Sequence, residues 1–340
     1  MGGNRAKCAA VFSVVLLLAA PAAADAIEDI INQVTLDDYM ADLRVLTGVD
    51  PVPTNPPYTL ANRYSYGQDI HVAGQWLYDQ FASYGLVSRQ DVFNSSYGPN
   101  IIGELPGTTR PDDIYIICGH YDTYHAEDQL HAPGCDDNGS GTATALMAAR
   151  ILSQYQFEGT LRFIAFSGEE QGLVGSAAYA QAAQAAGENI VGVINLDMFL
   201  HPGFDNVDPD PDYDLDIRSN PASLPLAQFL AGQFGLYTPI DIEVHPNAGS
   251  GSDYYSFWQH GYNAVGLSEN TSAEIWGGSN DSYHQLSDTI YNPDYDWQFG
   301  IETVRGAMAG MIGLAGLVPE PTSLVLLALL AFPLTWRRRA

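Results

Sequence analysis

Residues 161–170 read LRFIAFSGEE: an apolar run of strand length is followed by a serine, a glycine and two acidic residues, Glu169 and Glu170. Near-continuous apolar runs of this length are typical of strands in parallel sheets, which are buried on both faces. Ligands of open α/β sheets bind beyond the carboxyl ends of such strands. The stretch therefore predicts a buried parallel strand that carries two carboxylates to one edge of a sheet.

Similar apolar runs alternate with helical periodicity along most of the chain. We expect strands over residues 100–105, 114–118, 161–166, 190–196 and 264–267, and helices over residues 36–46, 70–84, 139–154, 176–186, 222–234 and 297–314. Alternating β and α segments favour a mainly parallel sheet with helices on both faces. We find no internal repeat, so the sequence predicts a single-domain α/β/α sandwich over residues 27–317.

The two ends of the chain have a different composition. Residues 1–26 contain Arg5 and Lys7, then an apolar run, then the small residues Ala22, Ala23 and Ala24. This order is that of a secretory signal peptide, and the apolar run is short for a transmembrane anchor. We therefore expect export of the mature chain.

Residues 318–340 contain the motif Pro319-Glu320-Pro321, an apolar run and three terminal-region arginines, 337–339. This tail resembles the PEP-CTERM sorting signal; a simple tail anchor is the alternative. The resemblance implies a Gram-negative source, processing by an exosortase-type enzyme, transient membrane contact and a final location in the envelope or outside the cell.

The chain of 340 residues is strongly acidic, with 13 Lys and Arg against 40 Asp and Glu. Residues 25–318 hold 8 basic and 39 acidic residues and no lysine. This balance excludes the basic patch of a nucleic-acid-binding protein, and an apolar fraction of 46% excludes general disorder. Cys118 and Cys135 are expected to be buried thiols, although an exported chain permits a disulfide.

Residues that can ligate metals follow several of the predicted strands. His120 ends one strand, Glu169 and Glu170 follow the next, and Asp197 closes the apolar run 190–196. Two further segments add Asp136-Asp137, just before a helix, and a second histidine, His284. Imidazole and carboxylate ligands together suit zinc, and also cobalt or manganese. Two Zn²⁺ ions would balance three ligand carboxylates and a hydroxide, which leaves one carboxylate as a general base.

Five ordered motifs resemble those of metallopeptidase family 28. They are GHYD at 119–122, GCDDNGSG at 134–141, FSGEEQGLVGS at 166–176, NLDM at 195–198 and HQLSDT at 284–289. The resemblance covers the whole mature domain and implies the fold of the zinc-dependent exopeptidases with two Zn²⁺ ions per chain. It also implies a peptide or protein substrate and, by default, aminopeptidase activity.

The resemblance also implies roles for individual residues. Asp136 would bridge both metals and Glu169 would be the general acid and base. The family typically has a cis bond between the bridging residue and the next, here Asp136–Asp137. The remaining expected ligands and their neighbours are His120 and Asp197 for one metal, Glu170 and His284 for the other, Asp122 and Asp137 beside the ligands, and Met198, Trp276 and Tyr283 along the substrate pocket.

Three other functions are alternatives to this one. A glutaminyl cyclase has the same fold with one working zinc, and a non-catalytic surface module of this fold would have lost ligands. A serine hydrolase is disfavoured because the chain has no Gly-x-Ser-x-Gly motif. The acidic stretch 205–216 lacks the glycine and final glutamate of an EF-hand. A solvated loop leading into a strand is expected there, with a loose calcium site as the alternative.

Overall fold

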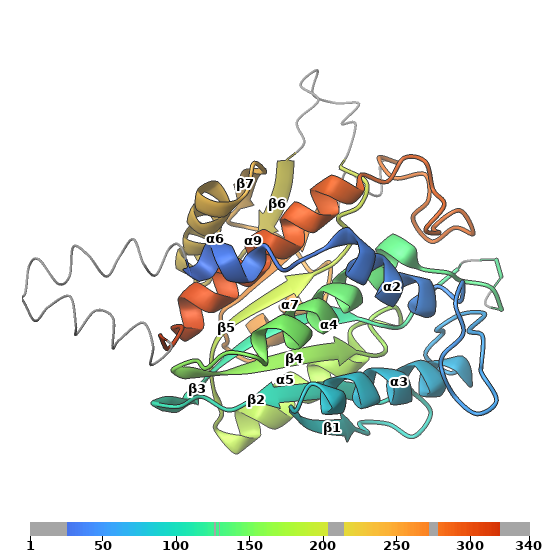
Figure 1. Cartoon of the computed structure of the whole chain (residues 1–340), viewed down its shortest axis with the longest axis horizontal. Coiled ribbons are helices and arrows are strands. Elements are labelled where there is room, and N and C mark those ends of the chain that lie inside the picture. Colours follow the sequence, from blue (N-terminus) through green and yellow to red (C-terminus); the bar gives the residue numbers. More distant parts are fainter. Residues whose placement is uncertain (1–25, 126, 129, 203–213, 272–277, 320–340) are drawn as a thin grey trace, which may run out of the picture.

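A single sheet of eight strands organises the described part of the chain (Figure 1). The computed structural model describes residues 26–125, 127–128, 130–202, 214–271 and 278–319. The strand order is β1-β2-β4-β3-β5-β8-β6-β7. The strands are β1 (Val87–Asp91), β2 (Asn100–Leu105), β3 (Arg110–His120), β4 (Gly159–Phe166), β5 (Asn189–Leu196), β6 (Asp214–Arg218), β7 (Asp241–His245) and β8 (Ala264–Ser268).

The sheet is mixed, with its parallel strands in the centre. The pairs β4–β3, β3–β5 and β5–β8 are parallel, whereas β1, β2 and β6 join their inner neighbours in antiparallel fashion. The predicted α/β sandwich with a mainly parallel sheet is confirmed. The five expected strands are present, and β6 is the strand into which the acidic stretch 205–216 was expected to lead. The short edge strands β1 and β7 were missed.

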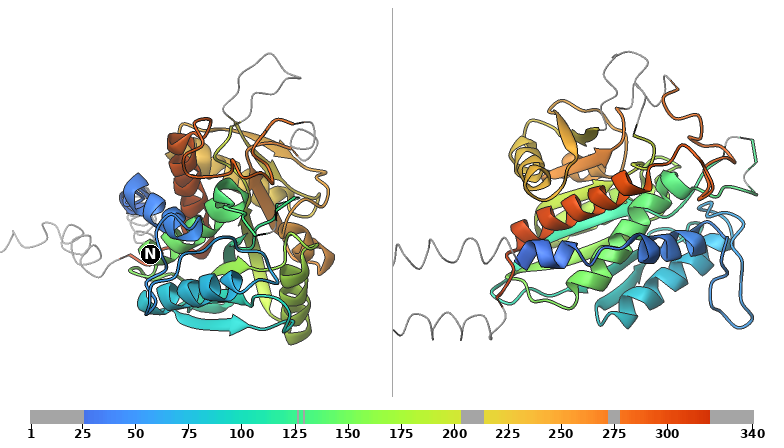
Figure 2. Two further views of the ribbon diagram at one scale, coloured as in Figure 1. Left: turned by 90° about the vertical axis from the view of Figure 1, so that its right-hand side faces the viewer. Right: turned by 45° about the horizontal axis from the view of Figure 1, so that its top comes forward.

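Helices cover both faces of the sheet, as predicted. They are α2 (Leu36–Leu46), α3 (Asp69–Ser83), α4 (Gly141–Leu152), α5 (Val174–Ala186), α6 (Leu224–Tyr237), α7 (Tyr254–Gln259) and α9 (Trp297–Ala315). One hydrophobic cluster contains buried side chains of α2, α3, α4, α6 and α9, and a smaller one contains those of α5 and α7. Figure 2 shows α9, α4 and α3 side by side on the face of the sheet that carries the larger hydrophobic cluster. Among these seven helices, α7 had not been expected.

Helices α6 and α9 pack closely at a glycine. A Cβ atom at Gly306 would lie 2.2 Å from a ring carbon of the buried Phe234, whereas a Cβ at Gly232 would meet nothing within 4 Å. We expect Gly306→Ala to lower the free energy of unfolding by about 1–3 kcal/mol through overpacking. Gly232→Ala should raise it by about 0.5–1 kcal/mol, because alanine has the higher helix propensity. Urea unfolding measures both changes, and equal effects would contradict this packing.

The last described residues are fixed beside the start of β4. Phe157 and Leu317 form an isolated antiparallel bridge, and the N–H of Val318 donates to the carbonyl of Gln156 at 2.8 Å. This end of β4 is the end opposite to Glu169 and Glu170. The expected signal peptide and sorting tail lie outside the described residues, apart from their innermost positions.

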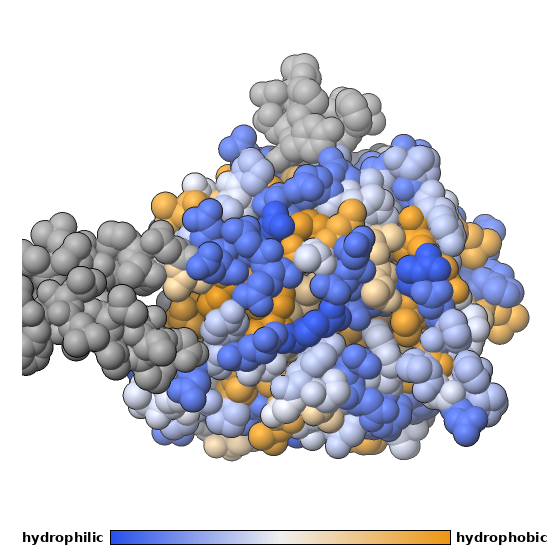
Figure 3. Space-filling model, in the orientation of Figure 1, coloured by the Kyte–Doolittle hydropathy of each residue, from blue (hydrophilic) through white to orange (hydrophobic). Residues whose placement is uncertain are grey.

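The face of the molecule drawn in Figure 3 carries both hydrophilic and hydrophobic residues. In Figure 3 hydrophilic residues run across the face formed by α2, α4 and α9, with smaller hydrophobic areas between them. Among the described residues, no helix combines the length and the apolar character that crossing a membrane requires. The larger exposed hydrophobic side chains, such as Leu130 and Tyr291, are scattered along the sequence.

Candidate metal centre

Residues at the carboxyl ends of three parallel strands lie at one edge of the sheet, as the sequence predicts. His120 is the last residue of β3, Glu169 and Glu170 follow β4, and Asp197 follows β5. These side chains line a small cavity of about 80 Å³. Its lining residues are His120, Asp137, Glu169, Glu170, Asp197, Met198, Arg218, Gly251, Ser268, Tyr283 and His284.

The carboxylate of Asp137 lies between the two histidines. Its Oδ1 is 3.4 Å from Nε2 of His120, and its Oδ2 is 3.1 Å from Nε2 of His284. Burial opposes ionisation of Asp137, but the hydrogen bonds to His120 and His284 outweigh it and lower its pKa. Asp137 therefore presents one charged oxygen to each histidine, which is the arrangement of a carboxylate shared by two cations.

This geometry corrects the sequence analysis, which gave that position to Asp136. The carboxylate of Asp136 turns away from the histidines, because its Oδ1 accepts hydrogen bonds from the N–H groups of Phe199 and Leu200, both at 2.9 Å. The predicted cis bond at Asp136–Asp137 is also wrong: the cis bond joins Asp137 and Asn138. Two adjacent aspartates cannot be told apart by residue type or by distance from the following helix, so the prediction was displaced by one residue.

The remaining predicted ligands flank Asp137. On one side, Nε2 of His120 lies 3.4 Å from Oδ1 of Asp197. On the other, Nε2 of His284 lies 3.0 Å from Oε2 of Glu170. Burial, followed by the charge of Asp137, raises the pKa of Glu170 to about 7, although His284 opposes the shift. The pairing of His120 with Asp197, and of Glu170 with His284, is the pairing that the sequence motifs imply.

Glu169 lies beside this group without approaching both histidines. Its Oε2 is 4.0 Å from Nε2 of His120, and the side chain is 14% exposed. Burial, together with the neighbouring carboxylates of Glu170 and Asp197, raises the pKa of Glu169 well above its ordinary value, although His120 opposes this shift. A raised pKa suits a group that must take up and return a proton near neutral pH.

Asp122 is completely buried and holds the acidic turn after β4. Its carboxylate accepts hydrogen bonds from the hydroxyl of Ser65 at 2.7 Å and from the N–H groups of Glu169 and Glu170, both at 3.3 Å. Nδ1 of His120 is 3.1 Å from the backbone carbonyl of Asp122 and 3.6 Å from its carboxylate. Asp122 thus positions both acidic residues, and its main chain orients His120 more directly than its side chain does.

A second buried carboxylate, Asp288, fixes the backbone of the aspartate pair. It accepts hydrogen bonds from the N–H groups of Asp136 at 2.7 Å and Asp137 at 3.1 Å, and from the hydroxyl of Tyr295 at 2.6 Å. Arg63, also buried, donates to the carbonyls of Pro133 and Gly134 just before the pair. Asp288 belongs to the HQLSDT motif, but residue type alone did not show that it acts on the backbone.

Two of the three residues expected along the substrate pocket line the cavity. Met198 and Tyr283 both line the cavity, and the ring of Tyr283 stacks on His284 with a centroid distance of 3.9 Å. Trp276 lies outside the described residues. Sequence reasoning missed Arg218 and Ser268, which also line the cavity. They come from β6 and β8, and the first of these strands had not been recognised as part of the sheet.

The residues present fit a pair of zinc ions. In the described part of the chain, Glu170 Oε1 and Asp197 Oδ1 are buried without a hydrogen-bond partner. A bound cation would offset the free-energy cost of burying these two oxygens. Two imidazole nitrogens and three carboxylates, with Asp137 in the middle, provide the mixed nitrogen and oxygen ligands that zinc accepts. The ligand set would be His120, Asp197, Asp137, Glu170 and His284.

Comparison with known sequences agrees with this site. The sequence model described as "Peptidase family M28" matches residues 100–300, a range that contains every one of these five positions. The chain belongs to peptidase family M28. One relative, a probable zinc metalloprotease of Pyrenophora tritici-repentis, is 29% identical over 206 residues. That match covers 54% of this chain and 46% of the relative, so this M28 chain spans less than half the length of that curated relative.

Solved structures share the fold of this M28 chain. The LapA aminopeptidase of Legionella pneumophila superimposes with a TM-score of 0.70 at 20% identity, over 86% of this chain and 75% of LapA. The glutaminyl cyclase of Porphyromonas gingivalis gives a TM-score of 0.61 at 17% identity, over 82% and 98% of the two chains. At these identities the likeness extends to the fold alone.

Proposed function

We propose that this protein is an exported zinc metallopeptidase that removes residues from the amino termini of peptides. The observation that carries the proposal is the placement of Asp137, which offers one oxygen to each histidine. Membership of family M28 and the zinc metalloprotease among its relatives support the metal and the reaction. The fold shared with an aminopeptidase favours attack near the amino terminus.

The zinc ions, when bound, would lower the pKa of a water molecule and polarise the carbonyl of the scissile bond. The chain itself would supply the proton transfer. Glu169 stands next to a ligand without lying between the histidines, and its pKa is raised. It can therefore accept a proton from the attacking water and return it to the amine that leaves.

The carboxylates of the cavity suit an amino-terminal substrate. Four of them line it, from Asp137, Glu169, Glu170 and Asp197. Two divalent cations would offset these four negative charges, and carboxylate oxygens that do not ligate a metal would accept hydrogen bonds from the positive α-amino group of a peptide. Tyr283 and Met198 add apolar surface at the same cavity.

Metal removal and reconstitution test the proposal. Peptidase activity against amino-acid anilides should be lost in 1,10-phenanthroline and should return with zinc. Elemental analysis should find two zinc ions per chain, because both histidine sides have their own carboxylate. One ion per chain, with release of ammonia from glutaminyl peptides, would instead favour the glutaminyl cyclase alternative. Fully bound zinc without hydrolysis of any substrate would favour a non-catalytic module.

The location of the protein is also a proposal. The signal peptide at 1–26 and the PEP-CTERM-like tail at 318–340 support export, exosortase-type processing and a brief membrane contact. The calcium alternative rests on residues 205–216, of which only 214–216 are described. There Asp216 is buried and lies 2.6 Å from Nε2 of His245.

A further inference from the structure

A series of aromatic side chains lies beside the candidate metal centre. Tyr66 is the most exposed of them, with 48% of the residue accessible to solvent. The centroid of its ring lies 4.5 Å from that of Tyr97 and 5.6 Å from that of Tyr64. The ring of Phe93 follows, 5.5 Å from Tyr97. Together with Tyr124 these residues are called the aromatic ridge, and their spacing is typical of paired aromatic side chains.

One end of the aromatic ridge reaches a predicted zinc ligand. The ring of Tyr124 lies 5.1 Å from the ring of His284 and meets it edge to face. The residues just before Tyr64 and Tyr124 are joined by the backbone, because the N–H group of Thr123 donates to the carbonyl of Arg63 at 3.2 Å. The two tyrosines therefore stand on neighbouring segments, and the ridge continues from Tyr64 to the metal centre.

The aromatic ridge also packs against the turn that carries Glu169. A Cβ atom at Gly168 would lie 3.0 Å from a ring carbon of Tyr97, so this ring contacts the residue directly before Glu169. Ser65, the sequence neighbour of two ridge tyrosines, donates to the carboxylate of Asp122. The same carboxylate accepts the N–H group of Glu169. The ridge and the proposed general base are thus fixed to one another.

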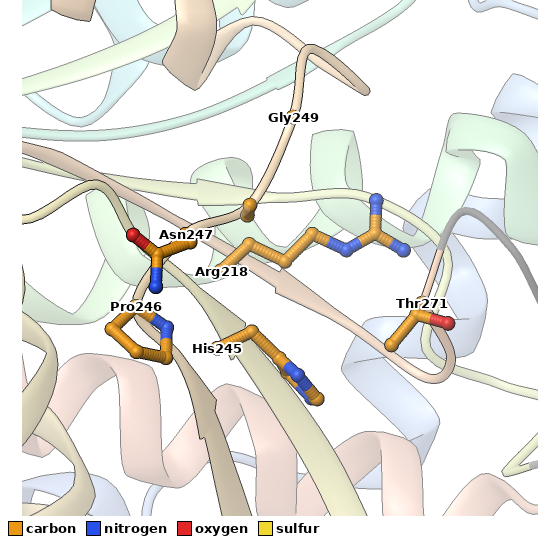
Figure 4. A pocket seen from close by; sticks show the side chains of 7 residues that line it. Arg218, His245, Pro246, Asn247, Gly249 and Thr271 are labelled. Atoms are coloured by element: carbon orange, nitrogen blue, oxygen red, sulfur yellow. The ribbon is translucent and has the colours of Figure 1, made fainter.

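The aromatic ridge and the second cavity lie on opposite sides of the metal centre. Tyr97 comes shortly before β2, which pairs with β4. The second cavity, of about 290 Å³ (Figure 4), is formed by β6, β7 and the segments after β7 and β8. The strand order places β3 and β5 between these two groups. None of the described residues that line the second cavity is Phe, Tyr or Trp, so the aromatic surface belongs to one side.

The position of Glu169 indicates which part of a peptide would lie on that side. In the proposed mechanism Glu169 returns a proton to the amine that leaves, so the departing part of the substrate begins beside Glu169. Exposed groups of apolar side chains commonly mark binding surfaces, and tyrosine is enriched among the residues that contribute most to binding. A further ring can join the series in the same edge-to-face or tilted geometry.

We propose that the aromatic ridge binds an aromatic side chain in the departing part of the peptide, with the ring of Tyr66 as its main contact. The inference rests on the proposed peptidase function and specifies its substrate class. That class is peptides with Phe, Tyr or Trp among the first three residues after the scissile bond, since three residues of extended chain span about 10 Å.

A set of tetrapeptide amides tests this inference. Leu-Ala-Ala-Ala-amide is compared with the three peptides in which one of its alanines is replaced by phenylalanine. The zinc-loaded enzyme should release leucine with kcat/KM about tenfold higher for at least one phenylalanine peptide, through added burial and ring pairing. The peptide that responds identifies the position bound by the ridge. Equal kcat/KM values for all four peptides would overturn the inference.

Two variants at one position connect the preference to the aromatic ridge. Tyr66→Ala should remove the preference for phenylalanine. Tyr66→Phe, which keeps the ring and loses only the hydroxyl bonded to Tyr97, should retain it. Tyr291→Ala removes a tyrosine that is 71% exposed and lies outside the ridge, and it should leave the preference unchanged. A preference that persists undiminished in Tyr66→Ala would overturn the inference.

Two further comparisons distinguish the ways in which the inference can fail. If Tyr66→Ala changes only the ratio between Phe-Ala-Ala-Ala-amide and Leu-Ala-Ala-Ala-amide, the ridge binds the amino-terminal residue and the inference is wrong. If no peptide is cleaved, the proposed peptidase function itself has failed. Calorimetry on the intact peptides then tests the ridge separately, because Kd should still be lower for a phenylalanine peptide and depend on Tyr66, and equal Kd values would overturn the inference.

Discussion

Glu169→Gln is expected to lower kcat for peptide hydrolysis by about 10²–10⁴-fold while the zinc content stays unchanged. Glutamine keeps the size of the side chain and its fit in the turn held by Asp122. It cannot accept the proton of the attacking water at neutral pH. Steady-state kinetics on an amino-acid anilide, combined with elemental analysis of the same sample, measures both quantities.

Glu28→Gln is the matched control for this prediction. Glu28 is exposed, far along the chain from the strand ends that form the metal centre, and the same change of charge there should leave kcat intact. Loss of zinc in Glu169→Gln would mean that Glu169 is a ligand. Full activity would show that another group moves the proton.

The second prediction with a large expected effect distinguishes the roles of the adjacent Asp136 and Asp137 in zinc binding. Asp137→Asn should lose at least one zinc ion per chain and with it nearly all hydrolysis, because an amide offers a single neutral oxygen and cannot serve both histidine sides. Asp136→Asn should keep both ions. The amide oxygen at position 136 can still accept the N–H groups of Phe199 and Leu200.

Asp136→Asn also tests whether the buried carboxylates around Asp136 repel one another. Burial, followed by the nearby carboxylates of Glu269 and Asp288, raises the pKa of Asp136 well above its ordinary value. Replacing Asp136 by asparagine removes this repulsion, so the thermal unfolding temperature of Asp136→Asn should not fall at pH 7. If Asp136→Asn loses zinc and Asp137→Asn keeps it, the assignment from the structure is the wrong one.

The sequence predicted the centre of this fold well because its strands are buried on both faces. Runs such as 161–166 are apolar at every position except Arg162, and their next residues had to lie at one sheet edge. The prediction that His120, Glu169, Glu170 and Asp197 lie together is therefore confirmed. The outer strands β6 and β7 carry no such continuous apolar run: β6 reads DLDIR and β7 reads DIEVH, with charged or polar residues at alternate positions.

What the sequence missed concerns the direction of side chains. Asp136 and Asp137 are both buried, and the N–H groups of Phe199 and Leu200, which are distant in sequence, hold the carboxylate of Asp136 away from the histidines. Arg218 escaped notice for a similar reason. It is the last residue of β6, opposite Gly266 of β8, and its side chain lines the cavity although the strand itself lies toward the edge of the sheet.

The way the chain leaves the domain sets the orientation of any attachment. Residues 316–318 are hydrogen-bonded beside the first residues of β4, and the eight residues of that strand run from there toward Glu169. At about 3.3 Å per residue the exit and the metal centre are separated by roughly 26 Å, on opposite edges of the sheet. A tether joined at residue 319 would therefore hold the domain by the edge of the sheet opposite to the metal centre.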